Sequence, residues 1–557
     1  MNSGVCMQFV SAMEKIFPEG DTGRPIERIS ALKNERLNFQ LVVVSPFERK
    51  GECKWTVKGS LAPYAEVRVV DYAKGYYNIR PDSDDYVIFR DGRVTLYPEI
   101  LRTPDYTDLC LYPNVYRTLW ITLFSPGGLP PGEHELSVCL KDWKGNFLAE
   151  KSITVCVVDV ELEKSDLVVT NWMHYDCIAG YYGEQVFSEG FYRILGKFFD
   201  SAFSHGINTV YTPLFTPPLD TERGGERRTV QTVGIRAENG KYEFDFSGLE
   251  KFIRFAESHG AEYFELSHLA TQWGAEFCPK IVAERGGREE KIFGWHTPSA
   301  GAEYRSFLAA FLPALVDRLK AWGIKDKCFL HISDEPSEEH LPDYLALKRW
   351  VETFSDGIPV IDALSDYGFY LKKAVDLPVV DIYNTEPFRE NNAKHWVYYC
   401  CSNHKQYVSN RFFNMPSQRN RILGMQMYLN GASGFLHWGF NFYNSYLSKE
   451  EINPFMTTDA GGFFQSGDSF VVYPARDGVW DSLRLEVFSD GLEDYRALKT
   501  LERQRGRAFT ESLLRDEGMA GYKIYRRDAN RHFDFREKIN ALISETAPYL
   551  PHEENMR

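Results

Sequence analysis

Between residues 164 and 465, short apolar runs alternate with amphipathic, helix-like segments, and this alternation constrains the fold more than any other feature of the sequence. The runs have few polar interruptions, which is typical of strands buried on both faces of a parallel sheet. Eight runs can be counted, beginning at Leu167, Ile207, Ala261, Cys328, Pro359, Pro378, His395 and Ser433. Eight parallel strands with intervening helices close a (β/α)8 barrel of the TIM type. We therefore predict such a barrel over residues 164–465.

The first 163 residues have a different period. In "ERLNFQLVVVS", the apolar residues Leu37, Phe39, Leu41 and Val43 alternate with polar ones, as in a half-buried strand. Runs of the same kind recur in "AEVRVVDY", "YRTLWITLFSP", "GEHELSVCL" and "KSITVCVVDVEL". Because turn residues rather than helices separate these strands, we predict an antiparallel β-sandwich over residues 1–163.

Further segments flank or interrupt the predicted barrel, so the chain is expected to hold several domains. From residue 466, the strand-like "DSFVVYP" precedes helical segments, which predicts a C-terminal strand and helical extension over residues 466–557. Two long insertions, "TPPLDTERGGERRTVQTVGIRAENGKYEFDF" and residues 274–299, follow the second and third barrel strands. We expect each to be a βα loop with a hairpin, and long loops on one barrel face usually shape a binding site.

Charge and apolar content exclude several kinds of partner. The net charge of -14 disfavours nucleic acids and anionic membranes, because both require clustered Lys and Arg. No apolar stretch approaches the roughly 20 residues that span a bilayer. The N-terminus lacks a basic segment followed by an apolar core, so we expect a cytoplasmic protein, although a secreted chain whose signal had been removed would look the same. The cysteines form no CxxC pair, which favours reduced thiols.

Two adjacent carboxylates end the fourth predicted strand, in "HISDEP". Asp334 and Glu335 therefore lie where catalytic side chains of a barrel gather, because the loops converge at the carboxyl ends of its strands. Pro336 is expected to bias Glu335 toward an extended backbone. An alternative is that the pair only starts the next helix, since Ser337 is a good N-cap and acidic residues are favoured there. Ser337 and the acidic residues after it already satisfy that start, which leaves the upstream pair for another role.

Adjacent carboxylates suit one kind of glycoside hydrolysis better than another. A like charge raises the pKa of one carboxyl while its neighbour stays ionised, so the two can take unequal roles. Ordinary retaining hydrolysis needs a second carboxylate about 5–5.5 Å away across the sugar, which adjacent residues do not normally provide. In substrate-assisted hydrolysis the 2-acetamido oxygen of the sugar itself attacks the anomeric carbon. Glu335 would then protonate the leaving oxygen, while Asp334 would hold the amide N–H and stabilise the oxazolinium intermediate.

Several segments together resemble glycoside hydrolase family 123. They are "HISDEP", "HWVYYCCSN", "NRILGMQMYLNGASGFLHWGFNFYN" and "SGDSFVVYPARDGVWDSLRLEVFSDGLEDYRAL", and their order is more specific than any one of them. The resemblance covers most of the chain and implies a retaining, exo-acting β-N-acetylgalactosaminidase, with Asp334 and Glu335 at the family's Asp-Glu pair. It also implies a glycan or glycolipid substrate with a terminal β-linked N-acetylhexosamine.

The ends of other predicted strands supply candidates for binding the sugar. We expect Trp438 to form a platform, Asn441 to bind a hydroxyl and Tyr398 to donate to the acetamido oxygen. Further substrate-binding candidates are Trp172, His174, His268, Trp273 and Tyr383. Structural alternatives stand beside these roles, since Trp438 can be core packing, Tyr398 can bond to backbone, and an isolated His is more often a structural hydrogen-bonding group.

Two other functions fit the same sequence. A glycosidase for a sugar without an acetamido group could use Glu335 as acid/base and Glu386, in "IYNTEP", as a covalent nucleophile. The simpler interpretation of Glu386 is a turn residue before Pro387. A glycan-binding or scaffolding protein could keep the barrel without catalysis.

We expect neither a metal nor another cofactor. His174, His268, His331 and the acidic pair converge on paper, but no HExxH, Cys/His or EF-hand spacing supports a metal site. There is also no GxSxG elbow, P-loop or GxGxxG motif after a strand. The oligomeric state is open, and a homo-oligomer is among the options.

Overall fold

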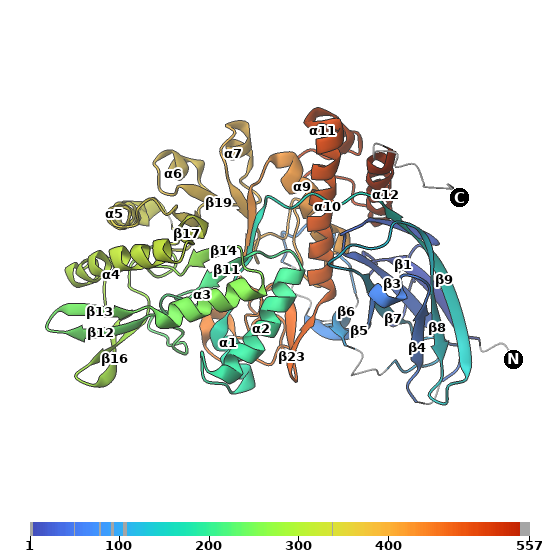
Figure 1. Cartoon of the computed structure of the whole chain (residues 1–557), viewed down its shortest axis with the longest axis horizontal. Helices are drawn as coiled ribbons and strands as arrows, with labels where there is room; N and C mark the ends of the chain where they lie inside the picture. The colour runs from blue at the N-terminus through green and yellow to red at the C-terminus, as the bar shows by residue number, and fades with distance from the viewer. Residues whose placement is uncertain are drawn as a thin grey trace, which may run out of the picture.

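The computed structural model describes residues 4–48, 51–76, 80–90, 94–103, 109–336 and 338–545. In Figure 1 the N-terminal sheets lie at one end and the barrel with its helices at the other, with α10 (Leu483–Arg505) between them. Within the described ranges, no helix is both long enough and apolar enough to cross a membrane.

Two sheets form the N-terminal part and enclose a core of their own. The first has the order β1-β3-β7-β5-β6, with β1 (Cys6–Ser11), β3 (Leu37–Val44), β7 (Arg117–Leu123), β5 (Ala65–Tyr76) and β6 (Val94–Arg102). The second has the order β2-β9-β8-β4, with β2 (Arg28–Leu32), β9 (Phe147–Val158), β8 (Gly132–Lys141) and β4 (Lys54–Lys58). Apolar residues from both sheets, such as Leu41 and Val155, are buried between them. The predicted sandwich is confirmed, except that β2 pairs with β9 in parallel. This pairing is possible because β2 and β9 are far apart in the sequence and are not joined by a hairpin.

Eight parallel strands form the predicted barrel. They are β10 (Val168–Asn171), β11 (Thr209–Thr212), β14 (Tyr263–Leu266), β17 (Cys328–Leu330), β18 (Ile361–Ala363), β19 (Leu377–Asp381), β20 (Trp396–Tyr398) and β21 (Gly434–His437). Each begins within two residues of its predicted start. The first and last strands, β10 and β21, pair with each other. In the described part of the chain, the seam between β17 and β18 is joined by one bridge, from Leu330 to Val360, and the carboxylate pair follows this seam.

Helices follow the strands and cover the outside of the barrel (Figure 1). They are α1 (Tyr175–Tyr182), α2 (Glu189–Ser204), α3 (Ser247–His259), α4 (Ala302–Ala321), α5 (Leu341–Glu352), α6 (Tyr367–Leu371), α7 (Glu386–Glu390), α8 (Ser417–Arg421) and α9 (Leu423–Asn430). Helix α2 shows how the sequence specifies them. The Ser188 hydroxyl caps its start by accepting the N–H of Phe191, and Phe191, Leu195 and Phe198 recur at helical spacing on the buried face.

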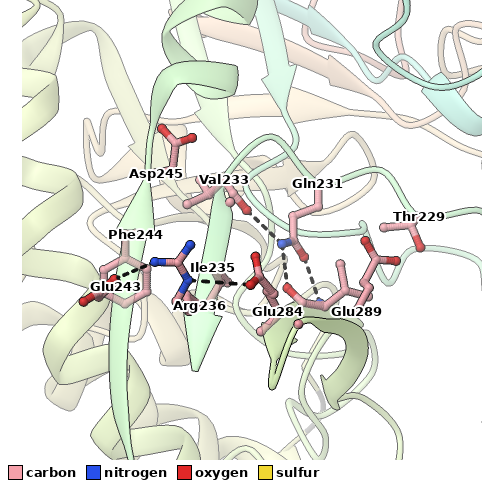
Figure 2. A pocket seen from close by; sticks show the side chains of 14 residues that line it. Thr229, Gln231, Val233, Ile235, Arg236, Glu243, Phe244, Asp245, Glu284 and Glu289 are labelled. Carbon is pink, nitrogen blue, oxygen red and sulfur yellow. Dashed lines mark hydrogen bonds and ion pairs between the residues drawn. The ribbon is translucent and has the colours of Figure 1, made fainter. Parts of the chain in front are cut away.

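Both predicted hairpins are present and build a separate sheet beside the barrel. They consist of β12 (Gly234–Glu238) with β13 (Lys241–Asp245), and β15 (Ile281–Arg285) with β16 (Arg288–Phe293). β12 and β15 join in parallel, which gives the order β13-β12-β15-β16. Figure 2 shows a hollow of about 710 Å³ against these hairpins, where Arg236 lies between Glu243 and Glu284. Arg236 therefore pairs with two of the four acidic residues of this hollow, and the lining as a whole is acidic.

The C-terminal elements follow the predicted order of a strand and then helices. They are β22 (Val472–Ala475), β23 (Gly478–Asp481), α10, α11 (Arg507–Asp516) and α12 (Ala529–Glu545). Helix α10 crosses α9 so closely that a Cβ on Gly424 would lie 1.6 Å from the carbonyl oxygen of Gly491. Helix α10 therefore packs directly on the barrel helices. The predicted domain boundary after residue 465 stays a prediction.

A buried ion cluster on α10 joins the sandwich to the barrel. Glu486 is fully buried and contacts Arg36 at 2.9 Å, Arg68, and Nε2 of His205 at 3.0 Å. Arg68 belongs to β5 of the sandwich, whereas His205 ends α2 of the barrel. Burial opposes the charge, but Arg36 and Arg68 hold the pKa of Glu486 well below its usual value. The relative placement of the two parts therefore depends on this carboxylate.

Replacing Glu486 by Gln would leave two buried arginines without their shared counter-charge. We expect a loss of about 3–5 kcal/mol in the free energy of unfolding, measured by urea denaturation with tryptophan fluorescence. Glu133→Gln is the matched control, because its pair with Arg28 is exposed and should contribute little to stability. Equal losses in the two variants would contradict a special role for the cluster.

Candidate active site

A pocket of about 230 Å³ opens at the carboxyl ends of the barrel strands. It is lined by Trp172, Leu219, Asp220, Gln272, Trp273, Asp334, Glu335, Ala363, Tyr398, Cys400, Cys401, Leu436, Trp438, Tyr446, Phe463 and Phe464. Both predicted carboxylates therefore lie in one pocket. Much of the remaining lining is aromatic, and flat rings suit the apolar C–H faces of a pyranose.

The backbone turns sharply at the carboxylate pair. Glu335 has a φ of 45°, in the left-handed region, rather than the extended conformation predicted from Pro336. The reason is geometric, because an extended backbone sends adjacent side chains to opposite faces, whereas this turn lets both reach the pocket. Such a conformation costs roughly 1–3 kcal/mol for a residue other than glycine. Asp220 and Trp273, which line the same pocket, also have positive φ, of 40° and 58°. Strain of this kind clusters at functional sites.

The alternative that the pair only starts a helix loses support. After Ser337, which lies outside the described residues, a 3-10 turn spans Glu338–His340 and α5 begins at Leu341. Glu335 therefore lies six residues before the α-helix, outside its first turn.

Burial and like charge govern the protonation of the pair. Burial, Glu335 and Asp362 raise the pKa of Asp334 well above its ordinary value. Protein surrounds Glu335 on most sides, although solvent reaches it through the pocket, and this partial burial raises its pKa. The hydroxyl of Tyr398 opposes that rise by donating to Glu335 Oε1 at 2.7 Å. The pair therefore favours a state with one proton between two carboxyl groups.

Asp362, on β18, holds the segment that leads from β17 to the pair. Its Oδ2 accepts the backbone N–H groups of Ile332 at 3.1 Å and Ser333 at 3.3 Å, and the hydroxyl of Tyr344. Its Oδ1 lies 2.9 Å from Nδ1 of His331. Side-chain hydrogen bonds therefore reinforce the seam at which the strand ladder is reduced to one bridge.

His331 lies between two buried carboxylates, three residues before Asp334. Its Nε2 is 3.2 Å from Glu265 Oε1, opposite the contact with Asp362. Burial opposes a charge on the ring, but hydrogen bonds to Asp362 and Glu265 raise the pKa of His331 to about 9. The ring is therefore an imidazolium at neutral pH.

Four predicted sugar-binding residues line the pocket: Trp172, Trp273, Tyr398 and Trp438. Trp172 is 3% exposed and belongs to the floor, whereas Trp273 is 47% exposed and belongs to the mouth. The indole N–H of Trp438 donates to Asp468 Oδ2 at 3.2 Å, so its ring is fixed. Their roles in binding stay predictions, but their placement agrees with them.

Asn441 and His174 hold each other and do not line the pocket. The Asn441 side chain accepts the backbone N–H of His174 at 2.8 Å and donates to its carbonyl oxygen at 3.1 Å. The His174 ring bonds to Arg227 at 3.1 Å and to the carbonyl oxygen of Trp438 at 2.9 Å. This arrangement agrees with the structural alternative for His174, a histidine held by hydrogen bonds, and Asn441 bonds to its backbone.

His268 and Tyr383 also lie outside the pocket lining. Nδ1 of His268 lies 2.7 Å from the hydroxyl of Tyr211, and the Tyr383 hydroxyl bonds to the backbone of Lys405. His268, His331 and Asp362 approach closely enough to share a metal ion. Both ring nitrogens of His331 are already within hydrogen-bonding distance of carboxylates, however, so this group is occupied by an ion-pair network.

The pocket also contains residues that no strand-end pattern predicts. Asp220, in the first insertion, donates its N–H to Gln272 Oε1 at 2.5 Å and accepts the N–H of Leu447 at 3.1 Å. Burial raises its pKa to about 6. Tyr446 and Phe463 stack with a centroid distance of 3.4 Å. These residues come from long loops, and only the length of the insertion signals that Asp220 reaches the site.

Glu386 lies apart from the pocket. It begins α7, and its carboxylate pairs with Lys523 at 2.9 Å. It is not among the lining residues, so the structure does not favour it as a nucleophile facing Glu335.

Fold and site together define the class of the protein. A (β/α)8 barrel with a strained carboxylate pair in an aromatic pocket has the features of a glycoside hydrolase. The family model described as "Glycoside hydrolase 123, catalytic domain" matches residues 172–501, more than half of the chain. The chain therefore belongs to glycoside hydrolase family 123.

Solved structures agree with this fold. A family 123 glycoside hydrolase from Clostridium perfringens, whose structure is described as giving details of glycolipid glycan hydrolysis, matches with a TM-score of 0.72 at 14% identity, covering 98% of this chain and 97% of that one. A glycosyl hydrolase family 2 member from Bacteroides cellulosilyticus matches with a TM-score of 0.29 at 10% identity, covering 79% and 48%. A beta-galactosidase from Bacillus circulans matches with a TM-score of 0.33 at 11% identity, covering 60% of this chain and 56% of that one. Neither of these two TM-scores supports an argument. No curated protein matches the sequence.

Replacing Tyr398 by Phe would remove the hydroxyl that donates to Glu335. Since this bond favours the ionised carboxylate, we expect the pKa of Glu335 to rise and the alkaline limb of the pH profile of kcat/KM to move up by about one unit. Tyr399→Phe is the control, because its ring packs on Phe435 instead. The same alkaline limb in Tyr398→Phe and wild type would contradict this coupling.

Proposed function

We propose that the chain is a retaining exo-β-N-acetylgalactosaminidase that releases terminal β-linked N-acetylgalactosamine from glycans or glycolipids by substrate-assisted catalysis. The observation that carries the proposal is the adjacency of Asp334 and Glu335 in one sugar-sized pocket. Adjacent carboxylates do not straddle a scissile bond, whereas they can act together on a substrate that supplies its own nucleophile.

The geometry gives the two carboxylates different tasks. Glu335 is the more exposed of the two, so it lies nearer to the path of the leaving group, and its raised pKa suits a general acid. Asp334 is less exposed, where it can accept the acetamido N–H and stabilise the positive charge of the oxazolinium intermediate. Tyr398 orients Glu335 in this structure, and its predicted bond to the acetamido oxygen would require the phenol to change partner.

The size of the pocket supports exo action. At about 230 Å³ it falls below the roughly 300–1,000 Å³ of sites for drug-sized ligands, which suits one sugar residue better than an internal stretch of an oligosaccharide. The description of the Clostridium perfringens relative as acting in glycolipid glycan hydrolysis supports a glycan or glycolipid substrate.

A panel of nitrophenyl β-glycosides tests the sugar. We expect release of nitrophenol from the N-acetylgalactosaminide, with at least tenfold lower kcat/KM for the N-acetylglucosaminide and essentially no turnover of the galactoside, which has no acetamido nucleophile. Galactoside hydrolysis at a comparable rate would contradict assistance by the substrate. Glycan binding without release of any sugar would instead favour a non-catalytic role.

Two substitutions in the pair test the division of tasks. Asp334→Asn should lower kcat/KM by about 100-fold or more even for nitrophenyl leaving groups, because it weakens stabilisation of the intermediate. Glu335→Gln should cost about 100–10,000-fold for a sugar leaving group but much less for nitrophenol, which departs without a proton. Equal losses of Glu335→Gln on both substrates would contradict its role as the acid.

The covalent alternative is tested at Glu386. Because Glu386 pairs with Lys523 outside the pocket, we expect Glu386→Gln to keep kcat within about threefold of wild type. A loss of 1,000-fold or more, measured with the best nitrophenyl substrate, would favour Glu386 as the nucleophile.

A further inference from the structure

Asp334 faces a larger electrostatic problem than Glu335. To accept an amide N–H and stabilise a cation it must be ionised, yet it is half-buried and three other carboxylates bear on it. These are Glu335 next to it, Asp362 on β18 and Asp220 on the loop after β11. Each raises the free energy of a negative charge on Asp334. A positive charge in this region would oppose these effects and favour the ionised form of Asp334.

His331 is the cation that lowers the pKa of Asp334, and its hydrogen-bond geometry indicates a charged ring. Its two ring nitrogens lie 2.9 Å and 3.2 Å from oxygens of Asp362 and Glu265. An ionised carboxylate only accepts hydrogen bonds, so both nitrogens must carry a proton if both carboxylates are ionised.

The other partners of the two carboxylates are all donors. Asp362 accepts two backbone N–H groups and the hydroxyl of Tyr344. Glu265 accepts the hydroxyl of Thr170 and the indole N–H of Trp172, at 3.4 Å for the latter. Burial raises the pKa of Asp362, whereas its hydrogen bonds to His331, Tyr344 and the backbone of Ile332 lower it. With donors at these other contacts, both carboxylates are placed to accept from an imidazolium between them.

The neighbouring rings carry no competing charge. His268 stacks on His331 with a centroid distance of 4.2 Å, and burial together with the charge of His331 lowers the pKa of His268 well below its usual value. The rings of Tyr211 and Trp172 also pack against His331, with centroid distances of 6.3 Å and 5.7 Å. The titratable groups that face His331 are thus Glu265, Asp362, His268 and Tyr211, with Tyr344 behind Asp362.

We propose that His331 is a positioning residue whose buried imidazolium favours the ionised form of Asp334 and which, through its bond to Asp362, fixes the strand end that presents the pair. This inference rests on the proposed function, because it concerns the group that would stabilise the oxazolinium intermediate. It adds a residue with no place in the pocket lining, and it gives the Glu265–His331–Asp362 triad a task beyond closing the barrel.

The kinetic test compares His331→Gln with His268→Gln. The two rings are equally buried and stack on each other, but only His331 is charged. Loss of the cation should raise the pKa of Asp334. Because Asp334 must be ionised to act, its protonation would then reduce activity at a higher pH than in the wild-type enzyme. We expect the acidic limb of kcat/KM in His331→Gln to move up by about one pH unit, with kcat falling more at pH 6 than at pH 8. His268→Gln should keep the wild-type limb, whatever its overall rate.

A second measurement reads the charge of His331 in the wild-type protein and does not depend on activity. In wild-type protein labelled with 15N-histidine, the ring nitrogens of His331 should both show imidazolium shifts at pH 7.5, with assignment by the resonance that Tyr344→Phe perturbs. A neutral ring would overturn the proposal, as would an acidic limb that is unchanged in His331→Gln or shifted equally in His268→Gln. Failure of the wild-type enzyme to cleave any N-acetylhexosaminide would instead refute the proposed function, while the ring shifts would still report the charge of His331.

Discussion

The hydrogen bonds of Asp362 are the interaction on which the site depends. The barrel closes between its first and last strands by a regular ladder, whereas β17 and β18 share one bridge among the residues that the structure describes. At that seam the Asp362 carboxylate takes over, accepting the backbone of Ile332 and Ser333 and contacting His331. The chain leaves the sheet after Leu330, and these bonds hold the segment that leads to Asp334. The Asp362 carboxylate therefore contributes both to the closure of the barrel and to the placement of Asp334.

The same region carries both strain and uncompensated charge. Glu335, Asp220 and Trp273 adopt left-handed backbone conformations around the pocket, and burial raises the pKa of all three of its carboxyl groups. These features cost stability, and elsewhere the protein is strongly held, for example by Glu486 between sandwich and barrel. This contrast is expected when a rigid scaffold holds an active site whose backbone strain and buried carboxyl groups lower stability.

Much of the architecture could be predicted because it follows from periodicity. The eight barrel strands, the sandwich and both hairpins are local patterns of apolar residues, and each barrel strand begins within two residues of its expected start. Asp334 and Glu335 could be predicted for a similar reason, because they follow a barrel strand, although β17 ends at Leu330, four residues before Asp334. Strand ends also led to Asn441 and His174, but there the side chains turn inward to support Trp438, and a pattern of residue types does not reveal direction.

The remaining parts of the site depend on long-range contacts. Asp220 reaches the pocket because Gln272 and Leu447, from two other loops, fix its backbone and side chain. The left-handed turn at Glu335 overrides the local preference set by Pro336, because presenting both carboxylates to one pocket requires it. In the sequence, His331 was considered only as a metal ligand, and no ligand spacing supported that role. Its position between Glu265 and Asp362 emerges only when three strands are brought together.

The central claim is that the nucleophile belongs to the substrate, and amide basicity tests it most directly. A series of nitrophenyl β-galactosaminides with N-acetyl, N-fluoroacetyl, N-difluoroacetyl and N-trifluoroacetyl groups weakens the acetamido oxygen stepwise without changing the leaving group. If that oxygen attacks the anomeric carbon, kcat/KM should fall steadily along the series, by several orders of magnitude in total. A rate that is independent of fluorination would show that a group of the protein attacks instead, and would contradict the account.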